Sequence, residues 1–534
     1  MSQPNLTSET ARLMRELEEA NKSNVYPAET TKIHISELTS LPAFAYEKLR
    51  NFVDYKDEFL LRKNAIKRFL KRKFLLPQFS HNTPAAAQAL IRELILSRYL
   101  PNDQIPESKV AALTAILTKY YLLFTNLARH KSTVPNWREQ ILGLAAVECD
   151  HQLVSPAERN AYTSYAYAAL KDILQLPPDE AANEPADVLL ILNIQRTLER
   201  ADNDISSYYL LVHYHPDWFN SAPDLAAANL ANNLDEILLN FNKLLNNKLG
   251  KRLIPKVKRL LVPIVILQDI IRSNSGSWRE VLTNSARLEH EARATYQKLW
   301  KNSRKRLRRK GFHAIIYIFL TKMILALLLE IPYERIVLEA INYTSVIINL
   351  MVPPVLMALI TVLIKSPSRD NENRVVLGVK ELVQGDAGDF YRLQTLKPIK
   401  AGLVKKLAYG FLYIITITAS FGGVGYFLWR LHFNIISAAI FFFFISLVSF
   451  FGISLRQQAR QLKVAADKET IVAFLLDFFS LPVVAFGKWL STTFDKVNIF
   501  VFMLDFLFEI PFKSFLKVLE DWFQFLKDKK EEIY

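Results

Sequence analysis

The sequence predicts an all-α integral membrane protein in which a large helical domain precedes membrane-spanning helices. Apolar residues recur at helical spacing through most of the first 310 residues, which indicates packed amphipathic helices. Beyond that point, apolar runs appear that are long enough to cross a bilayer. Strand signals are scarce, because the chain has only 14 glycines and few alternating β-branched runs.

Four regions follow from these patterns. Residues 1–35 are polar, and we expect them to be partly disordered apart from a short helix around Glu9–Glu19. Residues 36–310 are expected to form a cytoplasmic all-α domain of roughly eight to ten helices. Residues 311–456 are expected to form a four-helix transmembrane region, followed by amphipathic, membrane-associated helices over residues 457–534.

Helix starts in the second region carry capping residues. Ser155, Pro156 and Glu158 combine a capping hydroxyl, a first-turn proline and an acidic third position. The first 20 residues lack the apolar core of a secretory signal, so we expect no signal peptide. The single Cys149 has no partner for an intrachain disulfide.

Four apolar runs approach the roughly 20 residues that a helix needs to span the hydrocarbon of a bilayer. Lipid offers no hydrogen-bond partner to the backbone, so such runs cross as helices. The last two are joined by a very short turn, which predicts an antiparallel hairpin. The runs are Phe312–Leu329, Asn342–Ile364, Leu407–Trp429 and Phe433–Leu455.

The flanking charges predict the orientation of these spans. Seven basic residues lie between Lys301 and Lys310, and nine more lie between Lys365 and Lys406, whereas the opposite loops contain only Arg335 and Arg430. Because basic loops stay on the cytoplasmic side, we expect a multi-pass protein of the inner or plasma membrane. Its N-terminal domain and its C-terminus are both expected to be cytoplasmic.

The C-terminal region predicts an amphipathic helix with a narrow polar stripe. Asp505, Glu509, Lys513 and Lys517 recur every four residues among Phe, Leu and Val. The favoured interpretation is a helix that lies in the membrane interface. The alternative is a pair of spanning helices whose charged stripe faces a protein interior or a water-filled path.

Two basic segments are candidates for contact with anionic lipid headgroups, in keeping with a formal net charge of +15. The first lies in a helix expected over Arg62–Lys73, and packing of its Ile and Phe on the domain core is the alternative. Nucleic acid is the least favoured partner, because no recognised binding motif accompanies the charge. The candidate residues are Lys67, Arg68, Lys71 and Arg72 in the first segment, and Arg304, Lys305, Arg306, Arg308, Arg309 and Lys310 in the second.

Lys322 is the strongest single candidate for a functional residue. It lies near the middle of the first apolar run, where a charged side chain costs at least ~2.5 kcal/mol. A structural ion pair with Asp477, Asp505 or Glu509 is the favoured interpretation. Snorkelling toward the interface and a role in an ion or substrate path are the alternatives.

The second apolar run contains Asn349 and the pair Pro353 and Pro354. Consecutive prolines remove two amide donors, so this helix is expected to kink or unwind. Broken helices form ion sites in transporters, although simple bending is the favoured interpretation here. In the third run, Ala419 and Gly423 form a small-xxx-small pair, which predicts close helix packing, with a hinge as the alternative.

Candidates for metal chemistry are weak, and the sequence predicts no cofactor. Consecutive positions in Glu148–His151 point to different faces of a helix, so they do not form a metal site by themselves. The acidic cluster of Glu199, Asp202 and Asp204 and the pair His213 and His215 remain as possible divalent-metal ligands. The sequence contains no phosphate-binding glycine loop, no H-E-x-x-H and no nucleophile elbow, which favours a protein that is not an enzyme.

Three functions are therefore considered, and no motif carries a resemblance to a known family. The favoured one is a membrane-anchored scaffold or assembly subunit, with a protein partner or a second copy of itself. The second is a channel or transporter component that uses Lys322 and the kink at Pro353 and Pro354. The third is a membrane-bound metal-dependent enzyme.

Overall fold

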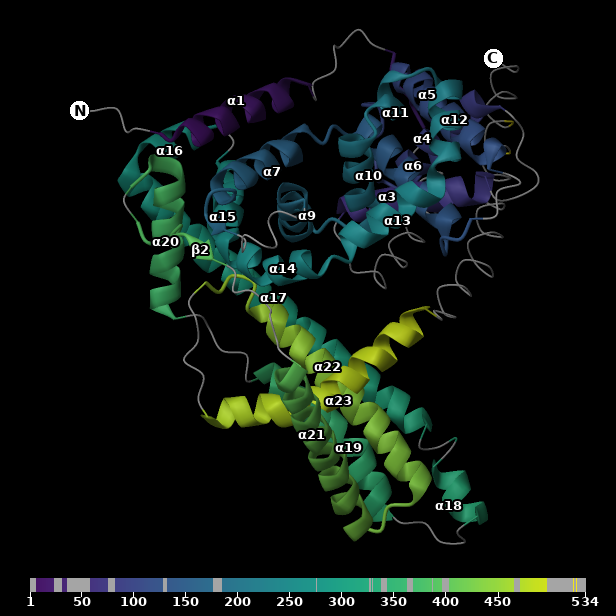
Figure 1. The fold of residues 1–534 in the computed structure, drawn as a ribbon, viewed down its shortest axis with the longest axis vertical. Helices are drawn as coiled ribbons and strands as arrows, with labels where there is room; N and C mark the ends of the chain where they lie inside the picture. The colour runs from purple at the N-terminus through teal and green to yellow at the C-terminus, as the bar shows by residue number, and fades with distance from the viewer. Residues whose placement is uncertain are drawn as a thin grey trace. The chain divides into compact units, whose positions relative to one another are not determined.

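The structure, a computed structural model, is almost entirely helical (Figure 1). Its only strands in the described part of the chain are two residues long: β1 (Leu174–Gln175) pairs in parallel with β2 (Gln394–Thr395). The all-α class is therefore confirmed. The structure describes residues 6–23, 31–35, 58–74, 82–127, 132–175, 185–274, 276–325, 328, 330–337, 343–362, 368–386, 388–395, 403–464, 471–496, 522 and 525.

The chain divides into two compact units near Val257 and Lys258. Unit 2 holds Ser8–Asp172 and Ala181–Val257, and unit 1 holds the chain from Lys258 through the last long helix, together with β1. The change of composition near residue 310 falls instead inside one uninterrupted helix, α17 (Ser285–Leu325). That helix carries the chain from the polar part of unit 1 into its apolar part.

Unit 2 is a helical domain with one main hydrophobic core. Its helices are α1 (Ser8–Ser23), α3 (Glu58–Phe74), α4 (Thr83–Leu96), α5 (Ser108–Asn126), α6 (Trp137–Leu153), α7 (Ala157–Leu170), α9 (Ala186–Leu198), α10 (Asn203–Tyr214), α11 (Asp217–Asn220), α12 (Pro223–Asn232), α13 (Leu234–Leu245) and most of α14 (Lys248–Leu260). Eight to ten helices were expected over residues 36–310; the helices described there, from α3 to the first part of α17, are more numerous, because several are short.

Helix α6 lies at the centre of this core. All residues from Ile141 to Asp150 are buried, so this stretch of the helix has no solvent face, as expected where other helices surround it. Helix α7 begins at Ala157 after its N-cap Pro156, one residue later than the capping pattern predicts, and the Ser155 hydroxyl accepts from the Ala157 amide at 3.3 Å. The short N-terminal helix that was expected is α1, which packs on α7 through Thr10 and Tyr165.

Unit 1 combines a polar helical layer with long apolar helices. Its helices are α15 (Val262–Ser273), α16 (Trp278–Thr283), α17, α18 (Ile331–Val337), α19 (Tyr343–Val362), α20 (Arg369–Gln384), α21 (Leu403–Arg430), α22 (Ile435–Ala459) and α23 (Ile471–Lys496). We call α15, α16, α20 and the first half of α17 the polar layer. The buried Asn371 of α20 connects this layer to the residues that follow α22. Its amide group donates to Tyr296 of α17 and to the Leu462 carbonyl, and its side-chain oxygen accepts from the Val464 amide.

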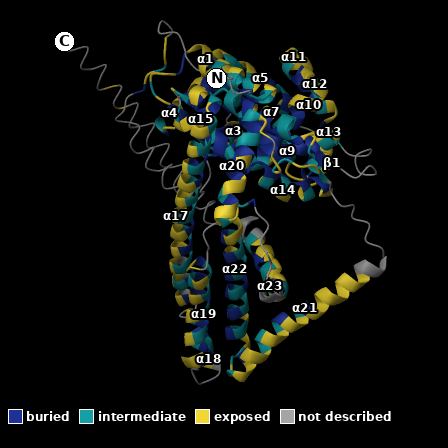
Figure 2. Cartoon of the chain, turned by 90° about the vertical axis from the view of Figure 1, so that its left-hand side faces the viewer, coloured by how far each residue is buried: buried dark blue, intermediate teal, exposed yellow. Residues whose placement is uncertain are grey.

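We call residues 311–325 of α17, together with α19 and α22, the stem. These helices lie side by side (Figures 1 and 2) and share a core that includes Ile318, Met357 and Phe444. A Cβ added at Gly311 would overlap the Thr361 side chain, so glycine there allows α17 and α19 to approach closely.

Helix α21 diverges from the stem in Figure 2 and is mostly exposed. A Cβ added at Gly422, Gly423 or Gly425 would meet no described atom within 4 Å, so the described residues do not provide the close packing predicted at Gly423. Helix α23 instead crosses α22 (Figure 1), and a Cβ on its Gly487 would overlap the Ser446 carbonyl. The tight glycine contact is therefore on α23, whose apolar residues pack against α22.

Three helices in the described part are long and apolar enough to cross a membrane: Tyr343–Val362, Leu407–Arg430 and Ile435–Ala459. They correspond to the last three predicted spans. The first predicted span, Phe312–Leu329, is not among them. Residues 326, 327 and 329 of that span lie outside the described part, and the described stretch from Gly311 to Leu325 covers about 20 Å of the ~30 Å of a bilayer core. A fourth crossing therefore stays a prediction.

Candidate functional site

A polar cluster is buried among the apolar helices of unit 1. Lys322 of α17, Glu330 and Glu334 next to or within α18, and Asn349 of α19 are each only 1% exposed. Charged groups in apolar surroundings are costly unless they are paired, so their arrangement needs a physical account. We call the following residues the stem cluster: Lys322, Glu330, Glu334, Ser345, Asn349, Asn434 and Ser437.

Asn349 provides two acceptors for Lys322. The Lys322 Nζ donates to the backbone carbonyl of Asn349 and to its side-chain Oδ1. In a regular helix, the carbonyl of residue 349 would accept the amide of residue 353. Residue 353 is a proline and has no amide hydrogen, so this carbonyl is free to accept from the lysine.

The side-chain amide of Asn349 extends the contact to two further elements. Its Nδ2 donates to Glu330 Oε1 at 3.0 Å and to the Ser437 carbonyl of α22 at 3.1 Å. Asn349 therefore connects a cation to a carboxylate, with its oxygen facing Lys322 and its nitrogen facing Glu330. One amide side chain joins α17, α19, α22 and the residue that precedes α18.

Glu334 holds the other end of the cluster. Its Oε1 accepts from Asn434 Nδ2 at 2.7 Å and, at 3.4 Å, from the hydroxyls of Ser345 and Ser437. Asn434 also caps α22, because its Oδ1 accepts the Ser437 amide at 2.7 Å. The same residue thus begins a stem helix and binds a buried carboxylate.

Aromatic rings close the cluster on the side of α22. The Lys322 Nζ lies 5.6 Å from the ring centre of Phe441 and 5.1 Å from that of Phe444. Ring faces attract a cation while they exclude water. The cluster can therefore hold a positive charge in apolar surroundings and tie helices together.

The structure brings together only some of the predicted intramembrane residues. Lys322 and Asn349 meet directly, and both prolines lie inside α19, which stays helical from Tyr343 to Val362. Unwinding, the alternative to the favoured bend, is not seen at Pro353 and Pro354, and Lys322 satisfies the Asn349 carbonyl that Pro353 leaves open. Asp505, Glu509, Lys513 and the side chain of Asp477 lie outside the described residues.

Sequence reasoning missed the acidic half of the cluster. Glu330 and Glu334 are four residues apart, directly after an apolar run, and this spacing was the available signal. Asn434 was also detectable, as a capping residue before the last apolar run. Their convergence with Lys322 depends on helix packing and has no counterpart in the sequence pattern.

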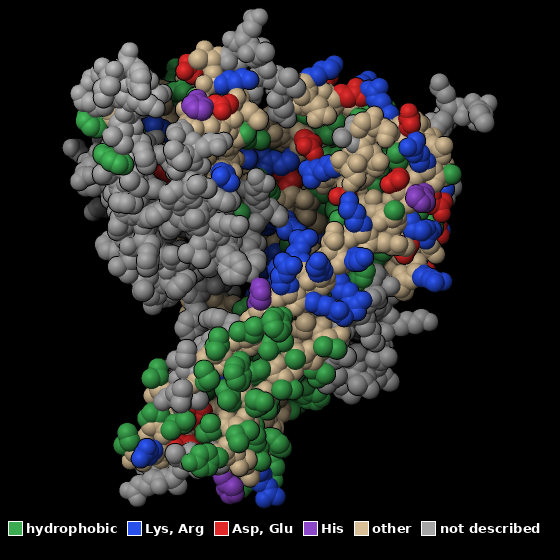
Figure 3. Space-filling view, turned by 180° about the vertical axis from the view of Figure 1, so that it is seen from behind, with side chains coloured by type: hydrophobic (Ala, Val, Ile, Leu, Met, Phe, Trp, Pro, Cys, Tyr) green, Lys and Arg blue, Asp and Glu red, His purple; other side chains and the backbone are tan. Residues whose placement is uncertain are grey.

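The basic segment before the stem has an exposed face. Lys305, Arg306, Arg308 and Arg309 are exposed, whereas Arg304 and Lys310 are half-buried, and Lys310 Nζ donates to Gln458 of α22 at 3.2 Å. Further along α17, the exposed side chains other than His313 are apolar: Phe312, Ile316, Leu320 and Met323. Figure 3 shows Lys and Arg side chains gathered where the apolar surface begins.

Most basic residues of α3 pair with carboxylates of unit 2, whereas Lys71 and Lys73 near its end are exposed. Arg62 binds Asp150 at 2.6 Å, Lys63 binds Asp202 and Asp204, and Lys67 binds Asp204 at 2.9 Å. Lys71 pairs with Glu139 and Arg72 with Glu93, while Arg68 is half-buried. This pairing favours packing within unit 2 over contact of this helix with lipid or nucleic acid.

The same ion pairs account for the acidic residues that were considered as metal ligands. Burial by itself would raise the pKa of Asp204, but Lys63 and Lys67 outweigh it and hold that pKa below its ordinary value. Asp202 caps α10 by accepting the Ile205 amide, and Glu199 accepts from Thr163 at 2.5 Å. These carboxylates therefore already have protein donors.

The two histidines of the metal hypothesis lie at the end of α10. His213 stacks on Tyr209, and His215 follows the last residue of that helix. Among the residues that the structure describes, no group of three or more His, Cys, Asp and Glu side chains could hold a metal ion. The geometry does not favour the metal-dependent enzyme.

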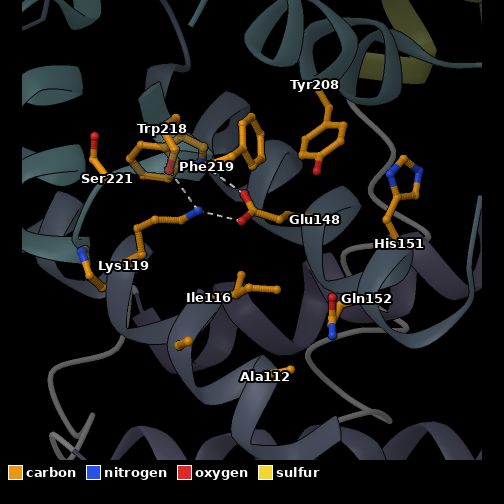
Figure 4. A pocket seen from close by; sticks show the side chains of 12 residues that line it. Ala112, Ile116, Lys119, Glu148, His151, Gln152, Tyr208, Trp218, Phe219 and Ser221 are labelled. Atoms are coloured by element: carbon orange, nitrogen blue, oxygen red, sulfur yellow. Dashed lines mark hydrogen bonds and ion pairs between the residues drawn. The ribbon is translucent and has the colours of Figure 1, made fainter. Parts of the chain in front are cut away.

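Unit 2 contains a pocket of about 390 Å³ between α5, α6 and α10–α12 (Figure 4). Glu148 lies at its wall and accepts three bonds: from Lys119 Nζ at 2.6 Å, Tyr120 OH at 2.9 Å and Trp218 Nε1 at 3.0 Å. Lys119 also lies 4.5 Å from the ring centre of Trp218. The carboxylate and the lysine therefore neutralise each other within the wall.

The remaining polar groups of the pocket are neutral. Burial lowers the pKa of His151 to about 3, with the cations Arg159 and Arg62 acting in the same direction. Burial also raises the pKa of Tyr208, whose ring meets His151 edge to face. With one closed ion pair and a neutral imidazole, the pocket is suited to an uncharged group and not to acid–base chemistry.

No protein-family model, no curated protein and no solved structure matches this chain.

Proposed function

We propose that this protein is a membrane-anchored scaffold, in which the stem anchors a helical interaction domain at the cytoplasmic face. The observation that carries the proposal is α17, a single helix of 41 residues. Its first half packs on α15, α16 and α20, and its last turns belong to the stem. A continuous helix of about 60 Å connects the stem to the polar layer rigidly, without a hinge between them.

The exposed face of α17 supports membrane anchoring. Lys305 and Arg309 are followed at helical spacing by Phe312 and Ile316, so one face passes from basic to apolar within a turn. This order suits a helix that enters a bilayer beside anionic headgroups, with about 1 kcal/mol per basic residue near the surface.

The surface of unit 2 supports a protein partner. Basic residues of α3 and α5 form ion pairs with buried and half-buried carboxylates of this unit, so these charged groups are not available for catalysis. Between residues 8 and 257, the large apolar side chains that the structure shows exposed all lie on α10, α12 and α13. They are Val212, Tyr214, Leu225 and Leu239.

Affinity purification of the tagged full-length protein from its native membranes in mild detergent tests this proposal. We expect a partner protein at fixed stoichiometry, which is lost in Leu225→Asp. Leu377→Asp on α20 is the matched control, since Leu377 is 57% exposed and Leu225 is 55% exposed. Absence of any stoichiometric partner, including a second copy, contradicts a scaffold.

A second candidate function is a channel or transporter component, and the stem cluster favours it. Buried ionisable residues within membrane segments often mark ion or proton paths. Reconstituted flux that changes sharply in Lys322→Leu would support this function. Absent flux across a panel of ions, or flux that the substitution leaves unchanged, argues for a purely structural cluster.

A further inference from the structure

Pro353 and Pro354 occupy equivalent positions but have different consequences for the stem cluster. Both are buried in α19, and each removes the amide that would bind a carbonyl four residues earlier. For Pro353 that carbonyl belongs to Asn349, which accepts from Lys322. For Pro354 it belongs to Leu350, the next residue along the helix.

We infer that Pro353 is a positioning residue, which keeps the Asn349 carbonyl open so that Lys322 can bind it and hold α17 against α19. We call this contact between Lys322 and the Asn349 carbonyl the lock. The lock then extends through the Asn349 side-chain amide to Glu330 and to the Ser437 carbonyl of α22. A proline in this place does not break the helix, because a lysine from the neighbouring helix replaces the missing donor.

The lock explains how a lysine is accommodated among apolar helices. Before α17 and α19 pack, the Lys322 ammonium and the open Asn349 carbonyl both lack a protein partner, and apolar surroundings make each of them costly. Packing satisfies both groups at once, and it does so in only one register of α17 against α19. The lock therefore selects the register in which the stem assembles, whether or not the protein is a scaffold.

The two prolines provide a matched pair for a test. Pro353→Ala and Pro354→Ala each restore one helical amide in the full-length protein, and the thermal unfolding midpoint is measured in detergent. Pro354→Ala should raise the midpoint, because the helix regains a hydrogen bond. The new amide of Pro353→Ala competes with Lys322 for the Asn349 carbonyl. The midpoint of Pro353→Ala should therefore lie about 3 °C or more below that of Pro354→Ala.

The same pair in a Lys322→Met background completes the cycle. Without the lysine there is no competition, so the two alanine variants should have equal midpoints. Equal midpoints in the presence of Lys322, or a difference that persists in Lys322→Met, would overturn the lock. The comparison with Lys322 present decides by itself if the Lys322→Met protein does not fold.

Discussion

Two lysines on different helices pair with glutamates of α6. The two pairs differ in burial, and therefore in how much each contributes to the free energy of unfolding. The Lys71–Glu139 pair has side chains 55% and 41% exposed, whereas those of Lys119 and Glu148 are 10% and 8% exposed. An exposed pair is screened by water and contributes little. A buried carboxylate with three donors cannot be removed without leaving a buried charge unpaired.

We therefore predict a large difference between two identical substitutions on one helix. Glu148→Gln should destabilise the protein by about 3 kcal/mol, because it leaves Lys119 buried without a counter-charge. Glu139→Gln should cost less than about 1 kcal/mol. Chemical denaturation monitored by circular dichroism measures both, and equal effects would show that burial does not govern these pairs.

His151 makes stability depend on pH. Its folded pKa of about 3 lies below the ordinary value of 6.5, so the unfolded chain binds a proton that the folded state excludes. The stability is fully present above pH 6.5 and is lost as the pH falls toward 3, by about 1.4 kcal/mol per pH unit. His151→Asn should remove most of this slope between pH 6.5 and 5, and the burial that lowers the pKa of His215 accounts for a smaller remainder.

His290→Asn is the control for this titration, since the His290 side chain is 81% exposed. Its unfolding free energy should follow the pH dependence of the wild type over the same range. A slope in His151→Asn as steep as that of the wild type would assign the proton uptake to another group.

At the scale of elements, α3 and α17 carry similar basic sequences that serve different purposes. The charges of α3 meet carboxylates from α4, α6 and the start of α10, whereas those of α17 lie on an exposed face that continues into apolar side chains. A basic residue that is already paired has less to gain from a headgroup. The neighbours of each helix, and not its own charge, determine whether its basic residues are paired or face outward.

This contrast predicts a selective loss of lipid dependence. Anionic lipid added to detergent micelles should raise the unfolding midpoint of the wild type more than zwitterionic lipid does. Lys305→Gln/Arg309→Gln should lose at least half of that difference. Lys71→Gln/Arg72→Gln removes the same charge from α3 and should retain it, and an equal loss in both variants would contradict a lipid-contact face on α17.

At the scale of the whole molecule, the arrangement of charge predicts how the chain is oriented. The basic segment of α17 and the end of α22 lie together through Lys310 and Gln458, at the opposite end of the stem helices from Asn434. Basic flanks stay cytoplasmic, so the turn between α21 and α22 should face the other side of the membrane. The polar layer and unit 2 would then be cytoplasmic.

Cysteine labelling in intact cells tests this orientation. The native Cys149 is buried, which keeps the background low. A membrane-impermeant maleimide should label Leu431→Cys in the turn without permeabilisation, and Gln461→Cys after α22 only once the membrane is opened. The reverse pattern would invert the predicted topology.

The all-α class, the three long apolar helices and the basic segment of α17 follow from the sequence by itself. Helical periodicity, apolar length and charge runs depend only on residues that are close in sequence, so they can be recognised without knowing the fold. Lys322 and Asn349 were identified in the same way, as polar residues in apolar runs.

Only the tertiary structure decided which of these groups meet. Asn349 is 27 residues from Lys322 and 88 from Ser437, and Lys63 is 139 residues from Asp202, so no local pattern relates them. Pairing of charges depends on which helices pack together and in what register. Burial then sets the energy of each contact, and only the packing of α17 on α19 shows that the carbonyl freed by Pro353 accepts from a lysine.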